Sequence, residues 1–110
     1  MKLPGGDRAY VDMAKLRDYC LNPHHLRGRH KARAFAERLD LTATRAEVLR
    51  EALLWAAREG EAKAGEEDGF GRRFVVEFIM EGPAGPVEIR SAWIVRKDED
   101  IPRLTSCYVV

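Results

Sequence analysis

The spacing of apolar residues changes from helical to alternating part-way along this chain, and that change constrains the fold more than any other feature. Up to residue 59, apolar residues recur every three or four positions, as in amphipathic helices. From residue 72 they alternate, with Phe74, Val76 and Phe78 on one face of a strand. Helices followed by antiparallel strands predict an α+β fold, in which N-terminal helices pack on one face of a C-terminal three- or four-stranded antiparallel sheet.

The helical half predicts two helices before residue 40. Asp12 is a suitable N-cap for a short helix, which Asn22-Pro23 ends because the residue before proline avoids helical geometry. A second helix is expected over residues 29–39, where Ala32 and Phe35 begin an apolar stripe.

A third helix is expected to begin near Thr44, whose spacing to Glu47 is that of a capping box. It is expected to stop at Gly60, and Val48 and Trp55 are expected to widen its buried face.

The sheet half predicts a meander of three strands. Residues 60–71 are expected to form a flexible acidic linker or turn, and residues 82–86 a tight turn between the first two strands. The last strand is expected over 103–110, and residues 8–11 are a candidate fourth strand at the edge. The whole chain, residues 1–110, is predicted to be one domain, with a helical half at 1–59 and a sheet half at 72–110.

Charge is distributed unevenly although the net charge is only +1. Residues 1–50 carry 11 Lys and Arg against 6 Asp and Glu, whereas residues 51–110 carry 8 against 12. The net charge therefore gives no reason to expect nucleic-acid binding. The basic N-terminal half is compatible with a local phosphate-binding face. Two cysteines are expected to be reduced, partly buried thiols, and no segment resembles a signal peptide or membrane span, so we expect a cytoplasmic bacterial protein.

The basic stretch, residues 22–35, holds all three histidines and four lysines and arginines but no acidic residue. Its first half is typical of a loop and its second half of a helix start, with Gly28 at the junction. Free backbone N–H groups at a helix N-terminus favour an anion, phosphate above all. The alternative interpretation is a solvated basic loop without a specific role.

Metal-independent RNA cleavage is the chemistry that these residue types fit best. The three histidines lack carboxylates or paired cysteines at ligand spacing, so no metal or other cofactor is expected. Imidazoles are suitable acid–base groups near neutral pH, which makes His25 and His30 candidates. Lys31, Arg29 and Arg90 are candidates to stabilise negative charge on phosphate.

Three hydroxyls on the last strand, those of Thr105, Ser106 and Tyr108, are candidates for phosphate contact or proton relay. Thr105 and Tyr108 have opposite parity, so a regular strand would turn them to opposite faces. A bulge or the chain end would be needed to place both in one groove. Their alternative role is that of polar residues in a half-buried strand.

Four segments, which together span almost the whole chain, resemble an uncharacterised bacterial family, a domain of unknown function. These segments are Lys2-Leu3-Pro4 with Asp12, Lys15 and Leu16; residues 21–35; Arg90-Ser91-Ala92-Trp93; and residues 102–108. The family is associated with toxin–antitoxin loci and with the C-terminal tips of larger secreted toxins. The resemblance implies a toxin that is neutralised by a small antitoxin protein with an acidic face.

The order of helices before sheet is also similar to the barnase–EndoU–colicin–RelE group of ribonuclease toxins, which implies RNA as substrate. This resemblance implies a catalytic set of Lys31, Arg90, Thr105 and Tyr108, with His25 and His30 as acid–base groups. Phosphate or RNA contacts are expected from Arg27, Arg29, Arg33, Arg103 and Ser106. The chain departs from the family pattern at Leu26, where proline is usual, and at His30, which leaves Lys31 the strongest single candidate.

The leading hypothesis is therefore an endoribonuclease toxin. One alternative is a non-catalytic module that presents a basic patch to nucleic acid or protein. Another is a homodimer in which residues 104–110 pair across a symmetry axis.

Overall fold

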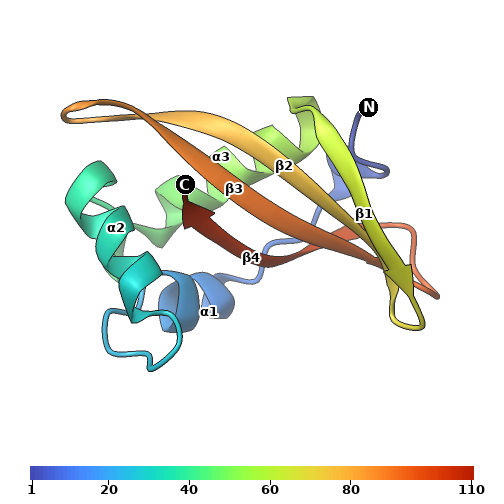
Figure 1. Cartoon of the computed structure of the whole chain (residues 1–110), viewed down its shortest axis with the longest axis horizontal. Helices are drawn as coiled ribbons and strands as arrows, with labels where there is room; N and C mark the ends of the chain where they lie inside the picture. Colours follow the sequence, from blue (N-terminus) through green and yellow to red (C-terminus); the bar gives the residue numbers. More distant parts are fainter.

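The computed structural model describes residues 1–110 and confirms the α+β arrangement (Figure 1). Its four strands form one antiparallel sheet in the order β1-β2-β3-β4. The elements along the chain are the 3₁₀ turn η1 (Gly6–Arg8), α1 (Met13–Lys15), the π-helical turn η2 (Leu16–Cys20), α2 (Arg29–Leu39), the 3₁₀ turn η3 (Ala43–Arg45), α3 (Ala46–Glu59), β1 (Ala62–Asp68), β2 (Gly71–Gly82), β3 (Gly85–Arg96) and β4 (Pro102–Val109).

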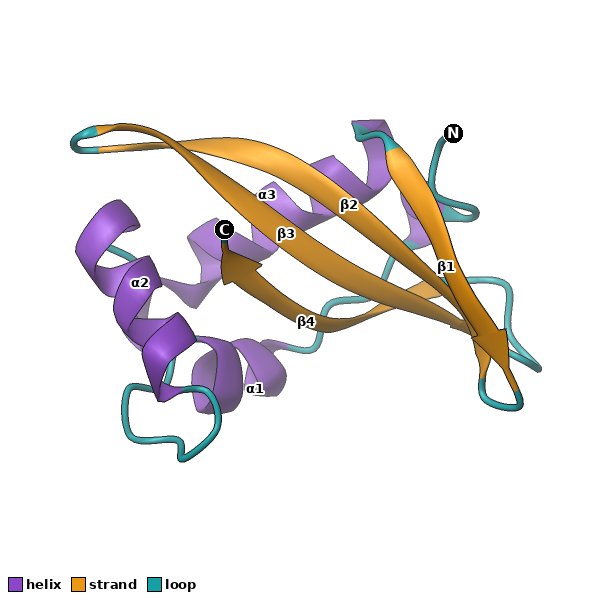
Figure 2. Ribbon diagram, in the orientation of Figure 1, coloured by secondary structure: helices purple, strands orange, loops and turns teal.

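The helices cover one face of the sheet and its β4 edge, as Figure 2 shows. Helix α3 crosses behind the strands, while α1 and α2 lie beside the C-terminal end of β4. Between the layers, Phe35 and Leu53 from the helices join Ile89 and Trp93 from β3 in one fully buried core. Burial of each such side chain contributes about 1.5–3 kcal/mol, so this contact holds the helical half on the sheet.

The first two helices confirm the expectations from sequence. Asp12 caps α1 by accepting a hydrogen bond of 2.9 Å from the backbone N–H of Ala14. Helix α2 spans Arg29–Leu39 as predicted, and Asp40 ends it in the left-handed conformation with φ 55°.

Residues 60–71, expected to be a linker, contain the strand β1. It pairs antiparallel with β2, and its register shifts between Ala64 and Glu67. Only Ala62 of the strand is buried, so the alternation of apolar residues that marks a strand in sequence is missing. The fourth strand is therefore β1, and residues 8–11 contribute only an isolated bridge between Tyr10 and Arg103.

The start of α3 also differs from the prediction. Arg45 occupies the N-cap position without a side-chain cap, and the Thr44 hydroxyl hydrogen-bonds that of Thr42 at 2.9 Å instead of forming a capping box. A 3₁₀ turn before the helix moves its start to Ala46, so Thr44 is too early to cap it. Val48 and Trp55 lie outside the buried stripe and are 41% and 53% exposed.

The strands β2 and β3 follow the predicted alternation, and β4 lies where the last strand was expected. The residues of β3 expected on one face are all buried, namely Val87, Ile89, Ser91, Trp93 and Val95. Pro83 and Ala84 form the turn between β2 and β3, where Gly85 has φ 126°, a value that favours glycine. The opposite face of the sheet has no helix over it (Figure 2). No helix is both long and apolar enough to cross a membrane.

Candidate functional site

Three predicted site residues from different elements meet near the end of β4. The Lys31 ammonium, on α2, lies 4.8 Å from the centroid of the Tyr108 ring. From the neighbouring strand β3, Arg90 Nη1 donates a hydrogen bond of 3.1 Å to the Tyr108 hydroxyl. Arg90 and Tyr108 are direct cross-strand partners, so the antiparallel pairing places both on the same face. We call this group the Lys31–Tyr108–Arg90 cluster.

Arg90 is held from its other side by Glu77 of β2. Arg90 Nε lies 3.6 Å from the Glu77 carboxylate, and the Tyr108 hydrogen bond, followed by the charge of Glu77, raises the pKa of Arg90. A hydrogen bond with Glu88, and then the charge of Arg90, lowers the pKa of Glu77, whereas the same carboxyl contact raises the pKa of Glu88. Glu77 is thus the ionised member of that pair, and Arg90 Nη2 makes neither a hydrogen bond nor an ion pair.

A β-bulge in β4 removes the parity conflict between Thr105 and Tyr108. Leu104 pairs with Trp93 and Ser106 pairs with Ala92, which leaves Thr105 as the inserted residue. Leu104 and Cys107 are both buried on the core side, and the two residues between them are only half-buried. Thr105 and Ser106 therefore join Tyr108 on the face away from the core, where the Thr105 hydroxyl donates to the Ala92 carbonyl at 3.1 Å.

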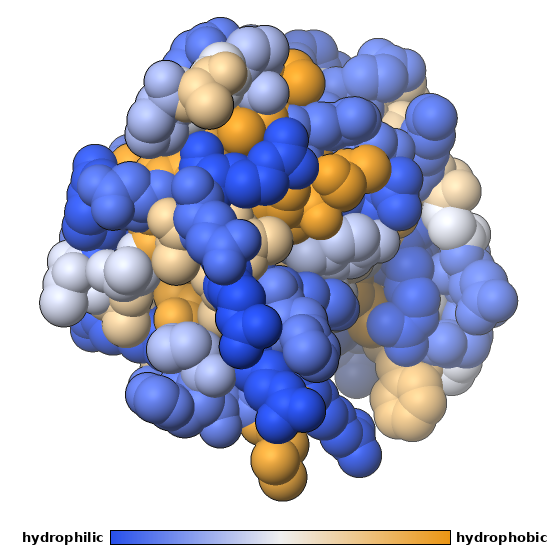
Figure 3. All heavy atoms as spheres, turned by 60° about the vertical axis from the view of Figure 1, so that its left-hand side comes forward, coloured by the Kyte–Doolittle hydropathy of each residue, from blue (hydrophilic) through white to orange (hydrophobic).

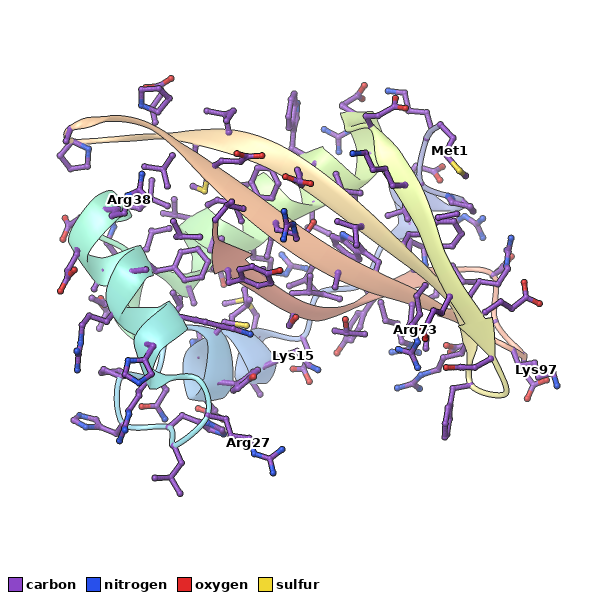
Figure 4. The ribbon with its side chains drawn as sticks, viewed as in Figure 1. Met1, Lys15, Arg27, Arg38, Arg73 and Lys97 are labelled. Carbon is purple, nitrogen blue, oxygen red and sulfur yellow. The ribbon has the colours of Figure 1, made fainter.

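Lys15 is a further cation at this site, and the sequence pattern alone did not predict a role for it. Its Nζ donates a hydrogen bond of 3.1 Å to the carbonyl of Thr105. Figure 4 shows Lys15 beside α1, toward β4. The pKa of Cys20 is lowered to about 7, mainly by a hydrogen bond with the thiol of Cys107 and in smaller part by the charges of Lys15 and Lys31. Both ammonium groups therefore lie near one thiol. The hydrogen bond joins Lys15 to a residue 90 positions away, so no local pattern could predict it. The only signal for Lys15 in the sequence was its place in a segment that resembles the family.

His25 has a structural role in the loop before α2. Its Nδ1 accepts hydrogen bonds from the backbone N–H groups of Arg27, at 3.1 Å, and Gly28, at 3.2 Å. This fixes the tautomer that carries its proton on Nε2. The ring packs edge-on against Tyr19 with 4.7 Å between centroids, and a Cβ on Gly28 would lie 2.8 Å from the Tyr19 carbonyl oxygen. His25 thus closes a tight loop that positions the start of α2.

His30 is exposed and makes no side-chain hydrogen bond or ion pair. It directly precedes Lys31 in α2, but no ring contact joins it to the Lys31–Tyr108–Arg90 cluster. Its acid–base role stays a prediction.

The predicted RNA-binding arginines fall into two groups. Arg27, Arg29 and Arg33 are exposed and form no ion pair, and in Figure 4 Arg27 points outward from the loop, away from the sheet. Arg103 lies toward the start of β4, where it binds Glu99 through two hydrogen bonds of 2.9 and 2.7 Å and stacks on Tyr10. The structure therefore separates Arg103 from the cluster and neutralises its charge locally.

The outer edge of β4 is partly occupied by the same chain. Tyr10 donates to the Pro102 carbonyl at 2.9 Å and accepts from the Leu104 N–H at 3.0 Å, while Lys15 bonds Thr105. A homodimer that pairs residues 104–110 would have to displace the Lys15 contact at the centre of the site.

Comparison with known proteins places the chain in a family. No curated protein matches the sequence. A solved structure described as a contact-dependent growth inhibition toxin – immunity protein complex from Klebsiella pneumoniae 342 contains a chain of similar fold, with a TM-score of 0.64 and 24% sequence identity. The match covers 90% of this chain and 91% of that chain. The family model described as "Domain of unknown function (DUF6883)" matches residues 2–110, and the chain therefore belongs to that family.

Proposed function

We propose that this chain is a toxin domain that cleaves RNA without a metal ion, with the Lys31–Tyr108–Arg90 cluster as its phosphate-binding centre. The observation that carries the proposal is the cluster itself, in which two cations flank one phenol on the sheet face without helices. The likeness in fold to a chain of a toxin–immunity complex supports a role as one of those two partners, and the cationic site favours the toxin.

In the proposed reaction, the ribose 2′-oxygen attacks the adjacent phosphorus and the bond from phosphorus to the 5′-oxygen breaks. A base accepts the proton of the 2′-hydroxyl, and an acid protonates the departing 5′-oxygen, which gives a 2′,3′-cyclic phosphate and a 5′-hydroxyl. Lys31 and Arg90 would stabilise the charge that develops on the pentacoordinate phosphorus, an effect worth about 3–4 kcal/mol for one well-placed donor.

The hydroxyls on this face have separate proposed tasks. Tyr108, oriented by Arg90, is the proposed proton donor to the 5′-oxygen. Thr105 and Ser106 would contact the non-bridging oxygens. His30 is the remaining candidate for the base, because the Nδ1 of His25 already accepts two backbone hydrogen bonds.

The exposed arginines suit the RNA strand on either side of the cleaved phosphate. Arg27, Arg29 and Arg33 have no acidic partner, so each is available to bind a phosphate of the RNA. Each such contact releases counterions from the RNA, which favours binding. The same positive surface would attract a small antitoxin with an acidic face.

A non-catalytic binding module is the second candidate, and the position of the histidines favours it. No histidine contacts the cluster, while the uncommitted arginines alone would bind nucleic acid. In that case affinity would fall gradually as Arg27, Arg29 and Arg33 are replaced, and no single residue would be essential.

Incubation of the purified protein with total RNA in excess EDTA tests the proposal. The wild type is compared with Lys31→Ala and with Lys97→Ala, which removes the same charge at the far end of the molecule (Figure 4). Discrete cuts with 2′,3′-cyclic phosphate ends by the wild type and Lys97→Ala, but not by Lys31→Ala, are expected. A folded wild type that cuts no RNA, with or without divalent metal, would overturn the proposal.

A further inference from the structure

A cavity of about 330 Å³ lies against α2, the helix that carries Lys31. Its walls come from η2 and the loop that follows, from α2 and from η3. Figure 3 shows the side of the molecule on which α2 and this loop come forward, where apolar patches interrupt a largely hydrophilic surface. None of the residues assigned to the cluster lines the cavity.

The floor of the cavity is apolar and built from small side chains. Ala32 and Ala36 lie one turn apart on α2, and Leu21 and Ala43 complete the surface. Leu21 and Ala32 are each 2% exposed, so this floor is part of the packed structure. Alanines in adjacent turns leave a flat surface of the kind against which a planar ring packs.

The rim of the cavity carries polar groups with unused bonding capacity. Arg17 forms no ion pair, and the His24 ring makes no hydrogen bond. The hydroxyls of Thr42 and Thr44 bond each other at 2.9 Å, and because only one of them donates in that bond, one donor and several lone pairs remain for a ligand.

The charge of the lining distinguishes this cavity from two of the three along the strands, the third being lined by Phe70, Arg73, Ile94 and Arg96. No acidic residue lines it, whereas Glu67, Asp68 and Glu99 line one strand cavity and Glu61, Glu77 and Glu88 another. A cationic rim over an apolar floor suits a ligand with a planar ring and a negative group. The volume is within the range of small-molecule sites, about 300–1,000 Å³.

We propose that this cavity binds one nucleotide of the RNA substrate, with its base against the alanine floor and its phosphate on Arg17 and His24. The inference rests on the proposed function for the identity of the substrate. Lys31 and Ala32 are consecutive in α2, so the cluster and the cavity lie on adjoining faces of one helix. A strand that crosses the start of a helix about 10–12 Å wide can reach both.

Titration of ¹⁵N-labelled protein with each of the four nucleoside 5′-monophosphates tests the cavity without any need for cleavage. Inorganic phosphate and ribose 5-phosphate serve as ligands without a base. We expect at least one nucleotide to shift the amide signals of Ala36, Ala43 and Thr44, and neither base-free ligand to do so. Shifts confined to Lys31 and Tyr108, or no shifts at all, would overturn the inference.

Two variants probe the floor and the rim separately. Ala36→Leu fills the cavity, and Ala84→Leu adds the same side chain in the exposed turn between β2 and β3. Arg17→Gln removes the rim charge and provides a second test if Ala36→Leu does not fold. We expect Ala36→Leu and Arg17→Gln to weaken nucleotide binding roughly tenfold or more while Ala84→Leu does not. Equal affinity in all folded variants would contradict the proposal.

These results separate the two proposals. RNA cleavage by a protein whose cavity binds no nucleotide would leave the ribonuclease function intact and remove the cavity from it. Nucleotide binding in the cavity of a protein that cuts no RNA would support the binding site and remove the ribonuclease.

Discussion

Lys31 Nζ lies 4.8 Å from the centroid of the Tyr108 ring, which joins the first turn of α2 to the last residues of β4. A cation–π contact between two half-buried side chains contributes about 0.5–2 kcal/mol, too little to organise the fold. Arg90 contacts the same tyrosine through its hydroxyl. The three side chains are therefore better explained as a site for an anion than as a source of stability.

Tyr108→Phe should separate the role of the ring from that of the hydroxyl. The variant retains the ring under Lys31 and loses only the acceptor of the Arg90 hydrogen bond, so its free energy of unfolding should fall by about 1 kcal/mol or less. If the hydroxyl donates the proton to the leaving oxygen, the cleavage rate should fall at least about a hundredfold, the lower end of general-acid effects. Denaturant unfolding and single-turnover cleavage measure the two quantities. An unchanged cleavage rate would remove Tyr108 as the acid.

His25→Ala should lower stability through the loop before α2. The change removes the acceptor of the Arg27 and Gly28 N–H groups and the contact with Tyr19, at a cost of about 1–2 kcal/mol. His24→Ala is the matched control, because that exposed ring makes no hydrogen bond. A fall in melting temperature for His25→Ala alone supports the structural role. Loss of activity at an unchanged melting temperature would instead indicate acid–base chemistry.

Ser91→Ala should be among the most destabilising small changes in the sheet. The buried Ser91 hydroxyl donates to the Val76 carbonyl at 2.7 Å and accepts from Trp93 Nε1 at 2.9 Å. Its removal leaves the indole N–H buried without a partner, which costs about 1–3 kcal/mol. Ser106→Ala removes the same atom from a half-buried position and should change the free energy of unfolding by less than half as much. Equal effects in urea unfolding would contradict this account.

Acid should weaken the turn between β3 and β4 through Glu99. Hydrogen bonds from Arg103 hold the pKa of Glu99 below its usual value, so the unfolded chain binds its proton more readily. The ionised carboxylate therefore stabilises the fold above the usual pKa of about 4.3, and this stabilisation is lost as the pH falls through the lowered pKa. Between about pH 5 and pH 3, the melting temperature of Glu99→Gln should fall less steeply than that of the wild type. Glu66→Gln, at an exposed carboxylate without an ion pair, should follow the wild type.

The two thiols should titrate far apart. The contact between them lowers the pKa of Cys20 to about 7 and, together with burial, raises the pKa of Cys107 well above its usual value. Absorbance at the thiolate band should therefore show one transition near neutral pH and none for the second thiol until strongly alkaline pH. Cys20→Ser should abolish the neutral transition. Two transitions at ordinary thiol pKa values in the wild type would contradict the contact.

Sequence periodicity predicted those elements in which one face is buried and the other is not. Helix α2 and strands β2 and β3 were found in this way, because burial of one face imposes an apolar repeat. Strand β1 was missed because it is an edge strand with only Ala62 buried, held by backbone pairing with β2. The start of α3 was misplaced because the capping-box pattern is compatible with the 3₁₀ turn that the chain forms instead.

The residues of the candidate site were predicted as types, while their arrangement depended on tertiary contacts. The sequence by itself determined the α+β order of elements, the buried faces and a basic stretch before α2, because each depends only on the local spacing of apolar residues or on local charge. Only the tertiary structure decided that a bulge turns Thr105 to the side of Tyr108, that Lys15 joins the site, and that Arg103 is paired away from it. These outcomes depend on strand register and on contacts between residues far apart in the chain, which no local pattern encodes.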